Sequence, residues 1–244
     1  MSVALITQAR FGSTRLPGKV LKTINGKSLL SMHLENAKRA KLVDHFMVAT
    51  TNEAESNLIQ AEAEKCGWSA FQGSTDDVLN RFYESVKIIN PTWVVRITSD
   101  CPLVQASLID DIISEAISKD CDYINTSLDF PDGVDVEVFK FEMLTKANQE
   151  AKLLSEREHV TPWIRKQAAK TVTFEAQTYM YKDVRLTVDE WADFECMERL
   201  IDKFGYEAHW EVYANYVSKN PELFRNQTIT RNEGYLKSIE KESK

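Results

Sequence analysis

Residues 9–19 read ARFGSTRLPGK, and they follow an apolar run, Val3 to Ile6. Apolar residues that lead into a glycine-rich turn predict a buried strand ending in a loop. Gly12 and Gly18 permit close backbone approaches, and backbone N–H groups in such a loop can bind oxyanions. The loop also carries basic and hydroxyl side chains: Arg10, Ser13, Thr14, Arg15 and Lys19. The stretch therefore predicts a loop that binds a polyphosphate.

The spacing of this loop excludes two common phosphate-binding motifs. Five residues separate Gly12 from Gly18, and Val20 follows Lys19, whereas a P-loop has four residues and then Gly-Lys-Ser or Gly-Lys-Thr. The three glycines of the dinucleotide-binding fingerprint are absent as well. A merely solvated basic loop is the alternative.

Composition limits the class of protein. The chain has 244 residues, 43% hydrophobic and 27% charged, which is typical of a globular protein. A net charge of −7 argues against a general nucleic-acid binder and makes the basic loop a local feature. Without an apolar run of about 18 residues or a secretory signal, we expect no membrane span and a cytoplasmic location. The cysteines form no CxxC pair, which suggests reduced thiols.

Strand-like and helix-like segments alternate along the first half of the chain. This order predicts an α/β protein with a parallel sheet, right-handed crossovers and helices on both faces. The expected strands are 3–6, 46–50, 93–97, 123–125 and 134–139, and the expected helices are 28–40, 53–66, 75–89 and 108–117. Thr75 is the expected N-cap of its helix.

The pattern changes after about residue 130. Predicted strands at 134–139, 171–179 and 184–188 surround a helix near 155–168, in which Ser155 and Glu158 fit a capping box. A further amphipathic helix begins near residue 190, and the tail after Asn220 has a weak pattern. We expect one domain over residues 1–244.

Two acidic residues follow predicted strands. Asp100 lies in TSDCPL (98–103), and Asp189 lies in RLTVDE (185–190). Each could be a turn or cap residue, but ligands in open α/β sheets sit beyond the carboxyl ends of strands. Mg²⁺ prefers one or two carboxylates together with phosphate oxygens. The basic loop and the two acids together favour a nucleotide-handling enzyme.

Several sequence blocks in the same order resemble the SpsF-like cytidylyltransferases, which are related to the CMP-Kdo and CMP-sialic acid synthetases. The resemblance implies a Rossmann-like α/β nucleotidyltransferase fold, a homodimer, and an additional small β element at about 127–182 for acceptor binding and dimerisation. The blocks are QARFGSTRLPGKVL (8–21), FQGSTDDVLNRF (71–82), VVRITSDCPL (94–103), GVDVEVF (133–139), SEREHVTP (155–162) and RLTVDEWADFE (185–195).

The resemblance also implies roles for individual residues. Arg15, Lys19 and Asp100 would be catalytic, and Asp100 and Asp189 would bind Mg²⁺. The nucleotide CTP would contact Ala9, Arg10, Gly12, Ser13, Arg15, Lys19 and Asp77, with cytosine read by main-chain groups near Ala9. The acceptor would contact Asp135, Glu137, Glu156, Arg157 and His159. The chain departs from the family pattern at Ser99, where the family has Gly, and at Glu190, where it has Thr.

The acceptor-side residues also have structural interpretations. His159 could be an ordinary buried histidine, and Glu156 could complement the dipole of its helix. Asp135 and Glu137 alternate along a strand and could be solvated. Arg96 lies in an apolar strand, so we expect a structural partner for it. Arg81 and Asp77 could pair at a spacing of four residues, or contact the ribose.

The resemblance implies Mg²⁺-dependent transfer of CMP from CTP to an acidic 2-keto sugar, with release of pyrophosphate, in surface polysaccharide biosynthesis. Transfer to a phosphorylated sugar, polyol or small acid, giving a CDP-linked product, is the alternative. A glycosyltransferase of related architecture is a second alternative. It would not need three basic residues in the first loop, because its nucleotide-sugar donor has no γ-phosphate. A non-catalytic nucleotide-binding protein would tolerate loss of either aspartate.

Overall fold

A seven-stranded sheet forms the centre of the computed structural model, which describes residues 1–177, 181–231 and 233–242. The strand order is β5-β4-β1-β6-β8-β7-β9, and β8 runs antiparallel to both of its neighbours while the other pairs are parallel. The strands are β1 (Val3–Gln8), β4 (His45–Thr51), β5 (Ser69–Gly73), β6 (Trp93–Thr98), β7 (Tyr123–Thr126), β8 (Glu137–Lys140) and β9 (Thr171–Phe174). A two-stranded sheet pairs β2 (Thr23–Ile24) with β3 (Lys27–Ser28).

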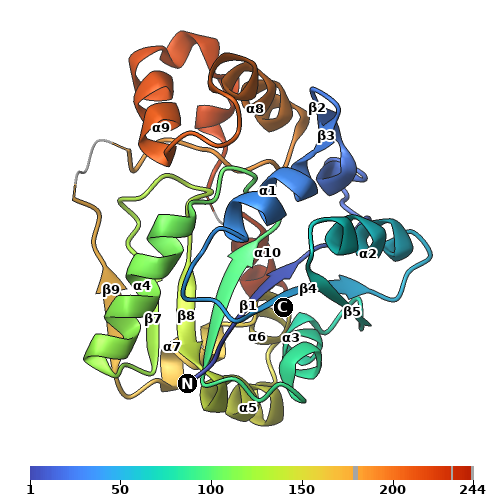
Figure 1. Cartoon of the computed structure of the whole chain (residues 1–244), viewed down its shortest axis with the longest axis vertical. Helices are drawn as coiled ribbons and strands as arrows, with labels where there is room; N and C mark the ends of the chain where they lie inside the picture. The colour runs from blue at the N-terminus through green and yellow to red at the C-terminus, as the bar shows by residue number, and fades with distance from the viewer. Residues whose placement is uncertain (178–180, 232, 243–244) are drawn as a thin grey trace.

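Helices cover both faces of this sheet (Figure 1). On one face Val3 and Leu5 of β1 belong to a core with α1, α2, α4, α8 and α9, and on the other Ala4 and Ile6 pack with α3, α5 and α7. Burial on both faces explains why β1 is a continuous apolar run. The helices are α1 (Leu29–Ala37), α2 (Ser56–Lys65), α3 (Val78–Val86), α4 (Ala106–Lys119), α5 (Phe141–Glu150), α6 (Leu154–His159), α7 (Pro162–Gln167), α8 (Trp191–Phe204), α9 (Trp210–Lys219) and α10 (Glu233–Glu242).

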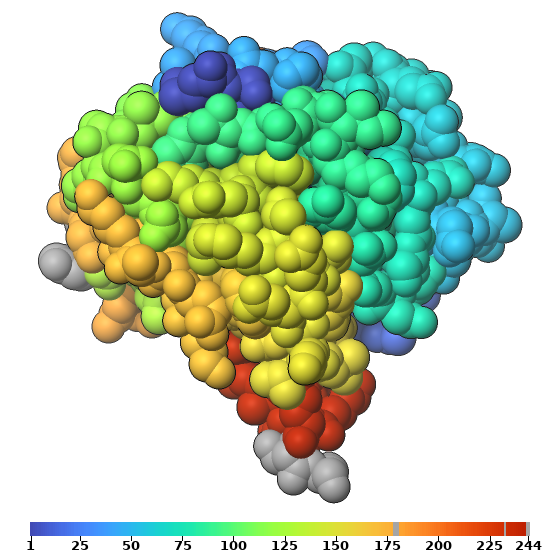
Figure 2. Space-filling model, turned by 90° about the horizontal axis from the view of Figure 1, so that it is seen from below, coloured from blue at the N-terminus to red at the C-terminus, as the bar shows by residue number. Residues whose placement is uncertain are grey.

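The last helix, α10, packs against α6, which lies far from it in the sequence. Figure 2 shows the C-terminal residues, in red, against the yellow residues that include α6. Short 3-10 helices η2 (Pro221–Leu223) and η3 (Arg225–Thr228) precede α10, and η1 (Lys19–Leu21) follows the first loop. Over the described residues, no helix has the length and apolar character needed to cross a membrane.

The predicted fold class is confirmed, with several corrections in detail. Strands β2, β3 and β5 and helices α5, α9 and α10 were not predicted. Residues 184–188 are not a strand, since they make only an isolated bridge between Asp132 and Arg185. Strand 171–179 ends at Phe174, and residues 178–179 lie outside the described residues. The predicted N-cap Thr75 is also wrong, because Asp77 accepts the hydrogen bond from Asn80 N (2.9 Å) that caps α3.

The predicted helix 155–168 is two helices. Between α6 and α7, Val160 has φ of 69° and ψ of −56°, and Thr161 N donates to His159 O at 2.8 Å. This geometry is a γ-turn of positive φ, which is rare and strained for a β-branched residue. The capping box expected from Ser155 and Glu158 is also wrong, because Glu156 accepts from the N–H groups of Lys152 and Leu153 instead.

Candidate active site

The topology brings three loops together at the carboxyl ends of β1 and β6. These strands are parallel neighbours with Gln8 opposite Thr98, so the loops that follow them start side by side. The segment before α8 joins them through hydrogen bonds from Val188 N (2.8 Å) and Thr187 Oγ1 (3.3 Å) to Asp100 O. Residues far apart in the sequence therefore meet where α/β proteins bind ligands.

Lys19 lies between the two predicted metal-binding acids. Its Nζ is 2.9 Å from Asp100 Oδ2 and 2.8 Å from Asp189 Oδ1. Burial would lower the pKa of Lys19, but the two carboxylates raise it. Burial would likewise raise the pKa of Asp100, but the charge of Lys19 holds it well below its usual range. Both carboxylates thus point at one cation, Lys19 Nζ.

Lys19, Asp100 and Asp189 form a charge cluster, and Arg15 extends this charge cluster toward solvent. Its guanidinium contacts Asp189 Oδ1 (3.2 Å), Glu190 Oε1 (3.4 Å) and Glu233 Oε2 (2.9 Å), and its side chain is 33% exposed. Two of the predicted phosphate-binding cations, Arg15 and Lys19, are therefore paired with protein carboxylates. Partly exposed pairs of this kind contribute little stability, so they can exchange partners readily.

Asp189 is free of the capping role that its position suggested. The carboxylate of Asp193, which is fully buried, accepts from the N–H groups of Asp189 (2.9 Å) and Glu190 (3.0 Å) at the start of α8. Arg185 holds this arrangement together through Asp132 (2.6 Å), Asp189 (3.0 Å) and Asp193 (2.9 Å). The sequence reasoning missed Arg185, Asp132 and Asp193, although Arg185 and Asp193 lie inside the RLTVDEWADFE block.

The first loop takes its shape from its glycines and main-chain bonds. Gly18 has φ of 65°, in the left-handed region, and a Cβ there would lie 3.0 Å from the ring of Phe11. Ser13 Oγ accepts from Leu16 N at 3.4 Å. Ala9, the predicted base-reading residue, is buried, and its N–H donates to Ala49 O at 3.2 Å.

Arg10, which belongs to this loop, lies near the buried Arg81 of α3. Arg81 is 2% exposed and donates to Ser74 O, and its Nε has no partner among the described residues. Burial, followed by the nearby charge of Arg10, lowers the pKa of Arg81 to about 10. Arg81 does not pair with Asp77, whose carboxylate accepts from Arg157 instead.

Asp77 and Arg157 connect the predicted nucleotide and acceptor sides. Arg157 Nε is 3.0 Å from Asp77 Oδ1, and Arg157 NH1 donates to Asn148 O at 2.9 Å. Because Asp77 also caps α3, this pair fixes α6 against α3 and α5.

Glu137 lies in a buried network rather than on an open strand face. It accepts hydrogen bonds from Arg96, from Tyr123 and, at 2.8 Å, from Thr161 Oγ1. Burial would raise the pKa of Glu137, but Arg96 and then Arg165 lower it. The structural partner expected for Arg96 is thereby confirmed.

The other acceptor-side residues contact the C-terminal segment. His159 Nε2 lies 3.1 Å from Ser238 Oγ, and its ring packs edge-on against Tyr235 at a centroid distance of 5.2 Å. Burial lowers the pKa of His159. Asp135 pairs with Arg231. His159 also adjoins the strained γ-turn at Val160, and such strain clusters at functional sites.

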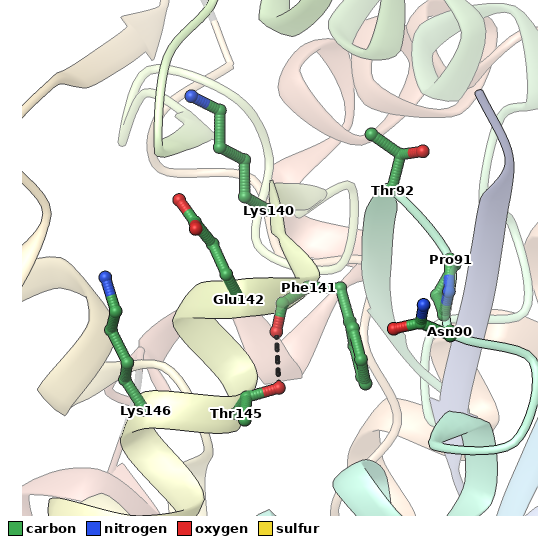
Figure 3. Close-up of a pocket in the computed structure, with 8 residues that line it drawn as sticks. All are labelled: Asn90, Pro91, Thr92, Lys140, Phe141, Glu142, Thr145 and Lys146. Atoms are coloured by element: carbon green, nitrogen blue, oxygen red, sulfur yellow. Dashed lines mark hydrogen bonds between the residues drawn. The ribbon is translucent and has the colours of Figure 1, made fainter.

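A separate pocket lies at the opposite end of the sheet. It has a volume of about 590 Å³ and opens to the surface. It is lined by residues before β6, by the last residue of β8 and by α5: Asn90, Pro91, Thr92, Lys140, Phe141, Glu142, Thr145 and Lys146. Figure 3 shows that its marked hydrogen bond, from Thr145 Oγ1 to Phe141 O, is internal to α5. Its lining lacks the paired acids and basic loop of the charge cluster, so we place the candidate active site at the cluster.

A mostly parallel sheet with a basic first loop and two carboxylates that converge beside it defines a nucleotidyltransferase. The family model described as cytidylyltransferase matches residues 4–229, and the chain belongs to that family. Its resemblance to the SpsF-like members is confirmed by the spore coat polysaccharide biosynthesis protein SpsF of Bacillus subtilis. That protein is 31% identical over 211 residues, covering 83% of this chain and 88% of SpsF.

Solved structures agree with this assignment. A cytidylyltransferase from Leptospira borgpetersenii superposes with a TM-score of 0.87 at 30% identity, covering 94% of this chain and 99% of that one. A CMP-2-keto-3-deoxy-manno-octonic acid synthetase complexed with CTP shares the fold, with a TM-score of 0.64 at 15% identity over 83% of this chain and 99% of that one. The chain is therefore an enzyme of the nucleotidyltransferase class.

Proposed function

We propose that this enzyme transfers CMP from CTP to an acidic 2-keto sugar in a Mg²⁺-dependent reaction that releases pyrophosphate. The observation that carries the proposal is the convergence of Asp100 and Asp189, from two separate loops, on a single cationic atom, Lys19 Nζ. The SpsF relative is named for polysaccharide biosynthesis and a structural neighbour for a 2-keto sugar acid, which supports a role in making surface polysaccharide.

The donor set fits a divalent cation. Two carboxylates already hold one positive charge between them, and Mg²⁺ prefers such a pair with phosphate oxygens and waters completing its shell. Asp100 and Asp189 would hold the metal, which when bound would neutralise charge on the α-phosphate. Lys19 and Arg15 would then exchange protein carboxylates for phosphate oxygens.

The first loop would hold the triphosphate. Arg10, Arg15 and Lys19 supply charge, Ser13 and the Gly12 backbone supply short donors, and the cytosine would lie near Ala9, with Asp77 beside the nucleotide. A hydroxyl of the acceptor would attack the α-phosphorus in line, and the bond to the β-phosphate oxygen would break to release pyrophosphate. Arg15 and Lys19 would neutralise the charge that develops on the departing group.

The acceptor would bind between the sheet and α6. His159 and Arg157 offer donors to a carboxylate, and Asp135 can accept from sugar hydroxyls. Glu137 and Glu156 would act through the network and the cap that they form. The element at about 127–182 would also carry a homodimer contact, and the enzyme would work in the cytoplasm without nucleic acid or membrane partners.

The test is pyrophosphate release from each of the four nucleoside triphosphates with Mg²⁺, against a panel of acidic sugars and sugar phosphates. We expect release with CTP and an unphosphorylated 2-keto sugar acid. Release only with a phosphorylated acceptor would replace the CMP-linked product by a CDP-linked one. Tight CTP binding with no release for any acceptor in the panel would count against a catalytic role.

A further inference from the structure

Helix α10 spans the candidate active site from the nucleotide loop to α6. At its start Glu233 Oε2 contacts Arg15 at 2.9 Å. In its middle, Ser238 Oγ donates to Glu158 Oε2 at 2.7 Å and lies 3.1 Å from His159 Nε2. At its end Glu242 accepts from the Ser155 hydroxyl at 3.1 Å. Figure 2 shows this docking of the C-terminal residues on the α6 region.

The packing of α10 against α6 fixes the position of Glu233. Ser238 is 3% exposed, so it is enclosed in the contact between α10 and α6. Ahead of the helix, Arg231 donates to Leu128 O (3.1 Å) and Phe130 O (3.0 Å). Anchored before its first turn and along its length, α10 places Glu233 at Arg15 by geometry rather than by chance contact of a mobile side chain.

Glu233 offers Arg15 the same chemistry as a phosphate. A guanidinium binds carboxylate and phosphate oxygens through the same N–H groups. A hydrogen bond from Lys237, with the charge of Arg15, lowers the pKa of the Glu233 carboxyl, so it is ionised at neutral pH. The Glu233 side chain is 36% exposed and can move away without opening the core.

We propose that Glu233 is a positioning residue that holds Arg15 before CTP binds and competes with the triphosphate of CTP for it. A triphosphate bound at Arg15 would face this carboxylate, and the like charges repel. Nucleotide binding therefore displaces the Glu233 side chain from Arg15. The inference rests on the proposed function of Arg15. The family model matches residues 4–229, and α10 lies beyond the matched residues.

The experiment measures binding of CTP with Mg²⁺ by isothermal titration calorimetry, without acceptor, in the full-length protein. Glu233→Gln should bind CTP about two- to five-fold more tightly, which is the size of effect that a partly exposed ion pair has. Glu240→Gln, on an exposed position of the same helix, is the matched control and should bind as the wild type does.

A double-mutant cycle separates competition for Arg15 from a general loosening of α10. In the Arg15→Gln background, Glu233→Gln should have no further effect on CTP affinity. Unchanged or weaker binding by Glu233→Gln, or equal tightening in both backgrounds, overturns the inference while leaving the proposed function intact. Failure of the wild type to bind CTP would overturn both.

Discussion

The nucleotide end and the acceptor side of the site use charge in different ways. Lys19 and Arg15 contact Asp100, Asp189, Glu190 and Glu233 through pairs that are partly open to solvent. On the acceptor side, Glu137 is enclosed with Arg96 and Tyr123, and Glu156 caps α6. The first region can exchange its partners for a ligand, whereas much of the second is committed to holding the fold.

This difference shows that the type of a charged residue does not by itself determine its role. Both regions hold acids and arginines in blocks that resemble the same family, yet burial decides what each charge does. Removal of one partner from a buried ion pair is expensive, so loss of Glu137 should destabilise the fold. An exposed pair contributes little stability, so the pairs around Arg15 are suited to binding.

The largest expected effect is on stability, and it concerns the buried network of Glu137, Arg96 and Tyr123. Glu137→Ala leaves Arg96 buried without its partner and should lower the free energy of unfolding by about 3–5 kcal/mol, measured by chemical denaturation. Glu150→Ala, at an exposed position, is the control. CTP affinity of the folded fraction should stay at the wild-type value. A variant of normal stability that fails only in acceptor turnover would break the comparison.

A substitution at the nucleotide end should instead lower activity and leave stability unchanged. Asp100→Asn should leave the fold intact and lower the rate of pyrophosphate release by about 10²–10³-fold, because it removes one of the two converging carboxylates. Circular dichroism and denaturation check the fold, and Asp111→Asn at an exposed position of α4 is the control. Near-normal turnover in Asp100→Asn would refute its assigned role.

A buried histidine beneath the nucleotide end predicts a pH dependence of stability. His33 is fully buried between Cys101 O (2.9 Å) and Thr7 Oγ1 (3.1 Å), and burial lowers its pKa from 6.5 to about 4. The unfolded chain binds a proton on His33 more readily than the folded chain does. The stabilisation that the neutral His33 contributes is therefore complete above pH 6.5. It is lost as pH falls toward 4, by about 3 kcal/mol in total.

Denaturation curves at several pH values check this, with the variant His33→Gln as reference. The difference in pH dependence between wild type and His33→Gln should equal the histidine contribution. Exposed His45→Gln should keep the wild-type profile. Identical slopes for wild type and His33→Gln would contradict the assignment.

The smallest expected effect concerns the cap of α6. Glu156→Ala removes the acceptor for Lys152 N (3.1 Å) and Leu153 N (3.2 Å) and should cost about 1 kcal/mol of stability. Glu156→Gln keeps an acceptor oxygen and should cost less. If Glu156→Gln instead abolished acceptor turnover at full stability, Glu156 would belong to the exchangeable group.

Local patterns in the sequence predicted much of the first half correctly. The apolar run of β1, the strand WVVRI and the helical periodicity of α1 and α4 each depend on neighbours within about ten residues, so they can be recognised without the fold. The basic loop and the position of Asp100 after β6 were equally visible, whereas the strand expected before Asp189 is absent. Strand β5, SAFQG, was missed because it is short and only half-buried.

Tertiary structure alone decided how these groups are used. Lys19 and Asp189 are 170 positions apart, and Arg15 and Glu233 are 218 apart, so no local pattern reports their contact. Asp193, not Asp189, caps α8, and the turn at Val160 splits the helix expected at 155–168. Periodicity encodes which face of an element is buried. Which charges meet depends on the packing of distant elements, and that packing separates exchangeable pairs from fixed ones.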